Sequence, residues 1–122
     1  MSLTQERITG SVVPAPRAQG SASWRALLES RWRDRLQELT QRCMAFHETG
    51  AQSVQDGPVQ ASLRRLMREA VRARQALAET DEALRRLAGG TFGYCEDCAG
   101  QIPAARLLIT PEARYCDRCT AS

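Results

Sequence analysis

The chain has 122 residues, a length typical of a single domain, and only 5% of them are aromatic. So few aromatic side chains exclude the large interior of a β-sandwich or an α/β fold, whereas the abundant Ala, Leu and Arg favour long helices packed through narrow seams. The formal net charge of +3 is too small to predict a dedicated DNA-binding protein.

Residues 1–23 are predicted to form a disordered N-terminal arm. They hold Gly10, Pro14, Pro16 and Gly20 among small polar residues and show no sustained apolar period. They also lack the pattern of a signal peptide, in which a charged stretch precedes an apolar one. No apolar run in the chain approaches the roughly 20 residues that a membrane span needs. We therefore expect a cytoplasmic protein with no membrane partner.

Residues 24–88 are predicted to form an antiparallel coiled-coil helical hairpin with a tip loop near residues 49–58. In the first helix, Ser23 is the candidate N-cap and Gly50 lies just past the last periodic position. Apolar residues recur there at steps of three and four, which is one face of a helix. These residues are Leu28, Trp32, Leu36, Leu39, Cys43 and Phe46.

The second helix is predicted to begin at Pro58 or Val59, after the turn residues Asp56 and Gly57, and to end at Gly89 and Gly90. Its apolar positions alternate at three and four residues over more than three heptads, the spacing of a coiled-coil seam. They are Leu63, Leu66, Ala70, Ala73, Leu77, Thr80, Leu84 and Leu87. A short loop makes the two helices antiparallel. The alternative is a compact oligomeric bundle.

Residues 89–122 are predicted to form a small C-terminal four-cysteine zinc finger. The cysteines follow the pattern C-x2-C-x17-C-x2-C. Two-residue gaps let both thiolates of a pair turn toward one ion, and two pairs complete a tetrahedral site that selects zinc or, less often, iron. The predicted ligands of one Zn²⁺ per chain are Cys95, Cys98, Cys116 and Cys119.

The alternative for paired cysteines is a disulfide framework. The odd count of five cysteines and the lack of a secretion signal favour zinc. The module also has too few apolar residues to fold by hydrophobic burial alone, so the metal is expected to hold it together.

The metal site is predicted to be structural rather than catalytic. No position stays open for water, and no carboxylate or histidine of the module is placed to act as a base, so we expect no enzyme activity. From Gly89 onward, three arginines are outnumbered by four acidic residues, which argues against sequence-specific DNA binding. Outside the module, we interpret Cys43 as a small buried apolar residue and His47 as part of a solvated helix end.

A helical hairpin followed by this cysteine pattern resembles the DksA/TraR C4-type zinc-finger family. The resemblance implies a bacterial transcription factor that binds RNA polymerase directly and inserts its hairpin into the secondary channel, so that the tip approaches the active centre. The residues that carry the resemblance are Gly90, Thr91, Phe92, Gly93, Tyr94, Cys95, Cys98, Ile102, Arg106, Leu107, Pro111, Cys116 and Cys119.

Three departures from the family pattern matter for function. The tip motif retains one acidic residue as Asp56, but Gln60 stands at the second acidic position. The basic residues that let some members bind ppGpp are replaced by Thr110 and Thr120, which predicts no ppGpp dependence. Ala99 stands where the family usually has Gly, which predicts strain if this residue has a positive φ.

The sequence thus predicts a DksA-like regulator of transcription initiation. One alternative is a zinc-clasped coiled-coil interaction protein with a different protein partner. Another is a transcript-cleavage-type channel factor, which would hold a second magnesium ion with acidic tip residues, although Asp56 is the one carboxylate in the tip motif.

Overall fold

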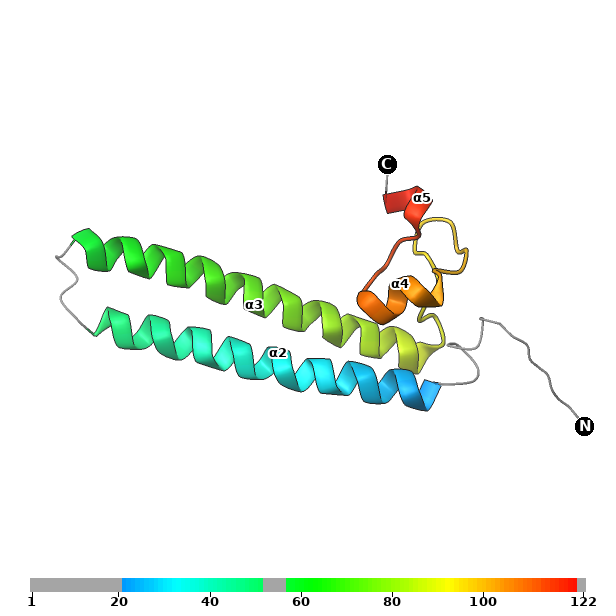
Figure 1. The fold of residues 1–122 in the computed structure, drawn as a ribbon, viewed down its shortest axis with the longest axis horizontal. Coiled ribbons are helices and arrows are strands. Elements are labelled where there is room, and N and C mark those ends of the chain that lie inside the picture. The colour runs from blue at the N-terminus through cyan, green and yellow to red at the C-terminus, as the bar shows by residue number, and fades with distance from the viewer. Residues whose placement is uncertain (1–20, 52–56, 121–122) are drawn as a thin grey trace, which may run out of the picture. The chain divides into compact units, whose positions relative to one another are not determined.

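The computed structural model describes residues 21–51 and 57–120. Within them lie two long helices, α2 (Ser21–Gly50) and α3 (Gly57–Gly89), followed by two short ones, α4 (Ala104–Ile109) and α5 (Asp117–Thr120) (Figure 1). The described residues form no extended strand; Tyr94 and Gln101 make an isolated antiparallel bridge. The prediction of a mainly helical fold with two long packed helices is confirmed.

The long helices begin and end close to the predicted positions. Helix α2 already includes residues 21–23, so Ser23 is not an N-cap and the last three residues of the predicted arm are helical. The rest of that arm lies outside the described residues. At the other end, α2 continues to Gly50, and α3 begins at Gly57, with Pro58 in its first turn. Asp56 also lies outside the described residues.

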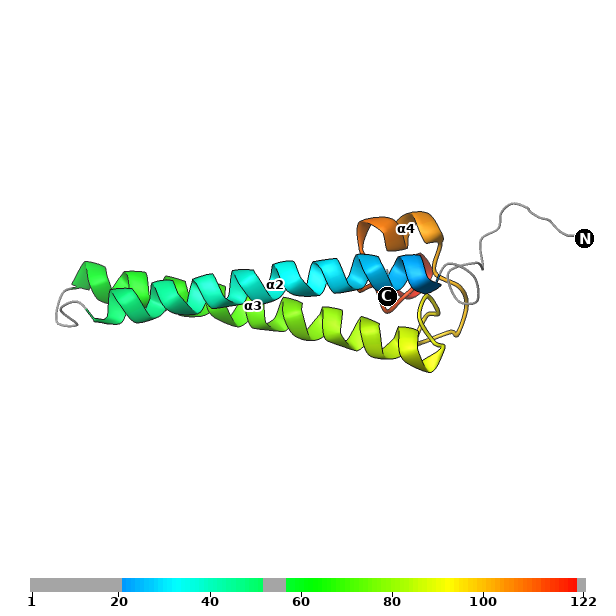
Figure 2. The same cartoon turned by 90° about the horizontal axis from the view of Figure 1, so that it is seen from below.

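The described residues divide into two compact units, one formed by residues 30–51 and 57–81 and the other by residues 21–29 and 82–120. In the unit of residues 30–81, segments 30–50 of α2 and 57–81 of α3 lie side by side and antiparallel, as both views show (Figure 1, Figure 2). This unit covers residues 30–81 of the hairpin predicted for residues 24–88, and the two ends of that hairpin group with the cysteine module.

A heptad seam on α3 supplies the buried positions of the hairpin. Leu66, Ala73 and Thr80 recur every seven residues and are all buried. The Thr80 hydroxyl donates a hydrogen bond to the Ala76 carbonyl at 3.2 Å, so its burial leaves no unpaired donor. These three residues belong to the predicted seam.

The apolar face of α2 is less buried than predicted. Leu36 is 39% exposed and Cys43 is also exposed. The interpretation of Cys43 as a buried residue is therefore wrong. The reason is that two helices bury only one narrow stripe of each other, and positions at the edge of that stripe stay in contact with water.

The other unit contains the main hydrophobic core. Leu28 of α2 and Ala83 and Leu87 of α3 pack with residues of the cysteine module. The Trp24 and Phe92 rings meet with centroids 5.3 Å apart and an interplanar angle of 51°, a tilted geometry that aromatic pairs favour. The module's contribution to this cluster is Phe92, Cys95, Ile102, Leu107 and Cys116.

None of the described helices combines the length and the apolar composition that crossing a bilayer requires.

Candidate metal centre

The first cysteine pair lies in a tight turn closed by backbone hydrogen bonds. The Cys95 N–H donates to the Gly100 carbonyl at 2.7 Å, and the Ala99 N–H donates to the Cys95 carbonyl at 2.9 Å. The Asp97 N–H points at Cys95 Sγ, 3.4 Å away. Backbone donors aimed at a sulfur stabilise its thiolate form, which is the form that binds a metal.

The turn requires a left-handed backbone at Ala99, whose φ is +63°. The strain predicted for this position is therefore present, because an L-residue with a Cβ disfavours this region. The next residue is confined as well: a Cβ added at Gly100 would lie 3.3 Å from Cys98 Sγ. The sequence C-E-D-C-A-G thus brings two sulfurs to one side of a turn at the cost of one strained alanine.

The second pair lies at the start of α5. The Thr120 N–H and hydroxyl both donate to the Cys116 carbonyl, each at 2.9 Å. This single helical turn brings Cys119 back beside Cys116.

The two turns bring the four thiols together. The sulfurs of Cys95, Cys98, Cys116 and Cys119 all lie within 4.8 Å of one another, and in the described ranges this is the one cluster of its kind. Cys98 Sγ and Cys116 Sγ are 3.7 Å apart. Four sulfurs placed tetrahedrally around zinc at about 2.3 Å are about 3.8 Å apart, so the donor set fits a closed four-thiolate zinc site.

The thiols differ in their tendency to ionise. Burial raises the pKa of Cys95, but hydrogen bonds from backbone N–H groups, with Cys98 and Cys116 the largest contributors, together bring that pKa down to about 6. A backbone hydrogen bond from Cys119 is the main cause that lowers the pKa of Cys116. The side-chain hydrogen bond with Cys116 raises the pKa of Cys119. The cluster already favours some thiolate character, as metal binding requires.

Glu96 connects the two cysteine pairs to each other and to α3. Its backbone N–H donates to the Arg114 carbonyl at 2.8 Å, and its carboxylate accepts a hydrogen bond from the Arg114 guanidinium at 2.8 Å. On its other side, Arg86 of α3 lies 3.6 Å from the same carboxylate. The hydrogen bond from Arg114 is the main cause that lowers the pKa of Glu96.

The Arg86 side chain is largely buried, with only 11% of it exposed. Burial lowers the pKa of its guanidinium, and the Glu96 carboxylate partly offsets that effect. Arg86 also donates to the Glu112 carbonyl at 3.4 Å. Its backbone carbonyl accepts the N–H groups of Thr91 and Phe92, so this one residue contacts both the entry and the later part of the module.

A second connection joins α4 to α5. Arg106 donates to the Asp117 carboxylate at 2.6 Å and to the Thr120 hydroxyl at 3.3 Å. Its Nε is buried and has no hydrogen-bond partner. The sequence predicts the total charge of the module but not these ion pairs or those around Glu96, because nothing in the local pattern indicates which residues meet.

The remaining residues singled out from the sequence lie elsewhere. Cys43 and His47 line an open groove on α2 with a volume of about 480 Å³, together with Leu39 and Met44. Neither residue is part of the four-thiol cluster. Asp56, the predicted tip residue, falls in the gap between the described ranges.

Comparison with known proteins identifies the cysteine module. A model of the prokaryotic DksA/TraR C4-type zinc finger matches residues 90–121. An uncharacterised protein of Aquifex aeolicus is 46% identical over 43 residues, which cover 35% of this chain and 30% of that protein. A match to YlyA of Bacillus subtilis, 50% identical over 32 residues, likewise covers 26% of each chain. The matched segments of both relatives are therefore confined to less than a third of their length.

Two longer matches extend over the hairpin. The RNA polymerase-binding transcription factor DksA of Escherichia coli K12 is 28% identical over 103 residues, which cover 80% of this chain and 67% of that protein. The structure of transcription factor DksA2 from Pseudomonas aeruginosa superposes with a TM-score of 0.83 over 91% of this chain and 88% of that one, at 22% identity, and shares the fold.

The segment matched by the family model contains all four clustered cysteines. Its donor set and spacing are those of a module that binds one zinc ion per chain. Residues 90–121 therefore match the prokaryotic DksA/TraR C4-type zinc finger family, and the chain shares the helical fold of DksA2.

Proposed function

We propose that this chain is a DksA-like regulator that binds RNA polymerase directly through the secondary channel and modulates transcription initiation. The observation that carries the proposal is the alignment with the E. coli RNA polymerase-binding factor over 80% of the chain, which includes the hairpin as well as the finger. The shared fold with DksA2 over 91% of the chain supports the same conclusion.

Cys95, Cys98, Cys116 and Cys119 are the residues that hold the zinc ion in this proposal. Four thiolates leave no coordination position for water, so the zinc orders the module and does not activate a substrate. The protein is accordingly a binding factor without a reaction of its own, and it acts in the cytoplasm, where its polymerase is.

The hairpin is the part that reaches the active centre. At about 1.5 Å per residue, the 30 residues of α2 and the 33 of α3 extend roughly 45 and 50 Å. Asp56 lies in the connection between Gly50 and Gly57 and is the proposed regulatory residue at the tip. A carboxylate there would alter the electrostatic field around the catalytic magnesium of the polymerase.

The proposal includes no ppGpp requirement and no sequence-specific DNA contact. Thr110 and Thr120 offer no charge to a pyrophosphate. The cation that contacts Thr120 is Arg106, and it is engaged by Asp117 at 2.6 Å. Within the module, the Arg114 guanidinium is engaged by the Glu96 carboxylate at 2.8 Å, which reduces the positive charge that it offers to DNA.

Affinity purification of the tagged chain from its host tests the proposal. We expect the core subunits of RNA polymerase in stoichiometric amount, and displacement of the chain by a competitor that blocks the secondary channel. Recovery of another protein in place of polymerase would indicate a zinc-clasped coiled-coil interaction protein. Stimulated RNA cleavage in stalled complexes would instead indicate a transcript-cleavage factor.

A further inference from the structure

Helix α3 carries two parallel rows of side chains within the hairpin unit, and all of them except the half-buried Leu63 are exposed. Residues 63, 67 and 71 form an apolar row of Leu63, Met67 and Val71, and residues 64, 68 and 72 form an arginine row. Successive members of each row are four residues apart, about 6 Å along the helix. Leu63 is half-buried, but Met67 is 50% exposed and Val71 is 47% exposed, so these two residues of the apolar row lie open to solvent.

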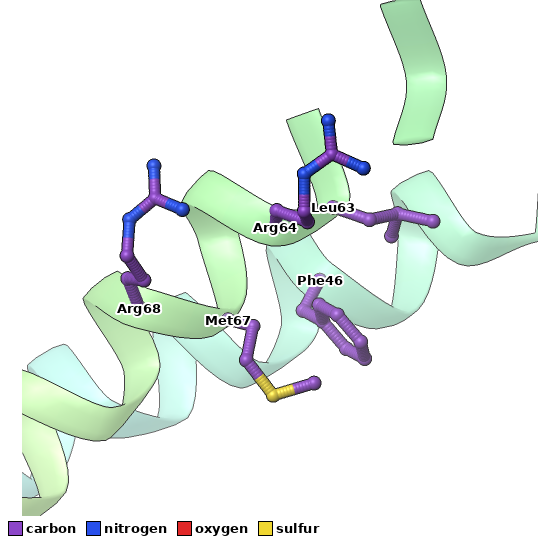
Figure 3. A pocket seen from close by; sticks show the side chains of 5 residues that line it. All are labelled: Phe46, Leu63, Arg64, Met67 and Arg68. Atoms are coloured by element: carbon purple, nitrogen blue, oxygen red, sulfur yellow. The ribbon is translucent and has the colours of Figure 1, made fainter. Parts of the chain in front are cut away.

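The two rows border a groove that α2 completes. Phe46 of α2 lies beside Leu63 and Met67, and with Arg64 and Arg68 these residues line a cavity of about 360 Å³. Figure 3 shows Arg64 and Arg68 extending in the same direction from successive turns of α3, with the Met67 and Phe46 side chains beside each other below them. The groove therefore has an apolar floor and a cationic rim.

The arginine row has no counter-charge among the described residues. Arg64, Arg68 and Arg72 make no ion pair there, and no carboxylate lines the groove. The neighbouring Arg65 behaves differently, since it pairs with Glu69 at 3.5 Å, and Glu69 also pairs with Arg42 of α2. The hairpin thus neutralises the arginine on one side of the helix and leaves the row beside the groove unpaired.

We propose that this groove docks an acidic segment of RNA polymerase that inserts one large apolar side chain between Phe46 and Met67. The inference rests on the proposed function and names the surface and the chemistry of its partner. Carboxylates about 6 Å apart, as at every fourth residue of a helix or every second residue of a strand, match the spacing of the arginine row. Guanidinium groups suit such paired contacts because they bind carboxylates bidentately.

A protein segment fits the groove better than an RNA strand does. RNA would engage the arginines through its phosphates, but it would leave the exposed Met67 and Val71 without an apolar partner. Burying those side chains against a protein gains free energy in proportion to the apolar area removed from water. The pairing of an apolar floor with a charged rim is the usual arrangement of a protein interface.

The test measures the affinity of the fluorescently labelled, zinc-loaded full-length chain for host core RNA polymerase. Arg68→Glu is expected to weaken binding about tenfold or more, because it places a like charge against the acidic segment. The matched control is Arg74→Glu. It makes the same charge change on an exposed residue of α3, six positions away and on a different face of the helix. The control is expected to change affinity less than about twofold.

Two substitutions at Met67 test the apolar floor. Met67→Ser is expected to weaken binding about tenfold, whereas Met67→Leu, which keeps the volume and apolarity, is expected to bind as the wild type does. Circular dichroism checks that every variant keeps its helix content. A photo-crosslinking phenylalanine analogue at position 67 is expected to crosslink to an acidic segment of a polymerase subunit.

The outcomes separate this inference from the proposed function. If the wild-type chain does not bind polymerase, both are overturned. If the wild-type chain binds, but Arg68→Glu and Arg74→Glu bind equally well, the proposed function stands and the groove is not the docking surface. A crosslink from position 67 to RNA, or to a segment without carboxylates, also overturns the inference and leaves the function intact.

Discussion

Glu96 and Arg114 are joined twice, once through the backbone and once through their side chains, at 2.8 Å in both cases. Glu96 lies inside the first cysteine pair, and Arg114 lies two residues before the second. The two halves of the metal site are therefore held in register by protein contacts as well as by the metal. Arg86 lies 3.6 Å from the other oxygen of the Glu96 carboxylate and extends this connection to the end of α3.

Glu96→Gln is expected to lower the free energy of unfolding of the zinc-loaded protein by about 1 kcal/mol, because the neutral amide keeps a hydrogen bond from Arg114 but loses the ion pairs with Arg114 and Arg86. Denaturant unfolding followed by tryptophan fluorescence measures the effect, since Trp24 packs against Phe92 in this unit. Glu79→Gln, a similar change on α3 at an exposed residue, serves as the control and should have little effect. Equal losses in both variants would show that the connection contributes nothing specific.

Metal analysis is expected to give one zinc per chain for the wild type. Cys95→Ser/Cys116→Ser should lose the zinc, because it removes one thiolate from each pair. Cys43→Ser should keep it, since Cys43 is exposed on α2 and outside the cluster. A double variant that retains a full equivalent of zinc would mean that these cysteines are not the ligands.

Ala99→Gly is expected to stabilise the protein by about 1 kcal/mol, because glycine removes the steric cost of φ +63°. The gain should appear as a higher midpoint in denaturant unfolding of the zinc-loaded chain. Ala88→Gly, at an exposed helical position of α3, is expected to do the opposite and destabilise by about 0.5–1 kcal/mol. A loss of stability in both variants would show that the positive φ of Ala99 does not destabilise the protein.

The residues that the sequence predicted correctly are those whose positions follow from regular spacing. Leu66, Ala73 and Thr80 lie seven residues apart and are buried together, and two C-x2-C turns bring four sulfurs into one cluster. Cys43 was mispredicted because a hairpin of two helices covers only part of an apolar face.

The contacts that sequence reasoning missed all depend on the folded path of the chain. Arg106 meets Asp117 across eleven residues, and Arg86 meets Glu96 across the helix end. No short-range period links such pairs, so composition reports their charges but not their partners. Phe46 of α2, which lines one groove together with Met67 of α3, is a further example.

The alarmone ppGpp is expected neither to bind this chain nor to enhance its effect on transcription. Thr110 and Thr120 supply no cation, and Asp117 neutralises the Arg106 guanidinium that contacts Thr120. The measurement is a ppGpp titration of transcription with a polymerase that lacks its own ppGpp site. Clear enhancement would show that another arginine of the module, such as Arg118, supplies the missing contact.

Asp56→Asn is expected to preserve affinity for polymerase and to reduce the effect on initiation. A single tip side chain adds little contact area, but its charge acts on the field around the catalytic magnesium. Binding is measured with core polymerase and function by transcription in vitro. A large loss of affinity in this variant would make the tip a docking element instead of a regulatory one.

Ala73→Pro, in contrast to Asp56→Asn, is expected to abolish binding to polymerase, because it damages the hairpin itself. Ala73 is buried in the middle of α3, where proline removes a backbone hydrogen bond and clashes with the preceding turn, at a cost of about 3 kcal/mol or more. Zinc content should stay at one per chain, because the cysteine module belongs to the other unit. If Asp56→Asn leaves transcription unchanged while Ala73→Pro abolishes binding, the hairpin serves for docking and the tip is inert. If Ala73→Pro binds normally, polymerase recognises the zinc module, and the channel hypothesis is wrong.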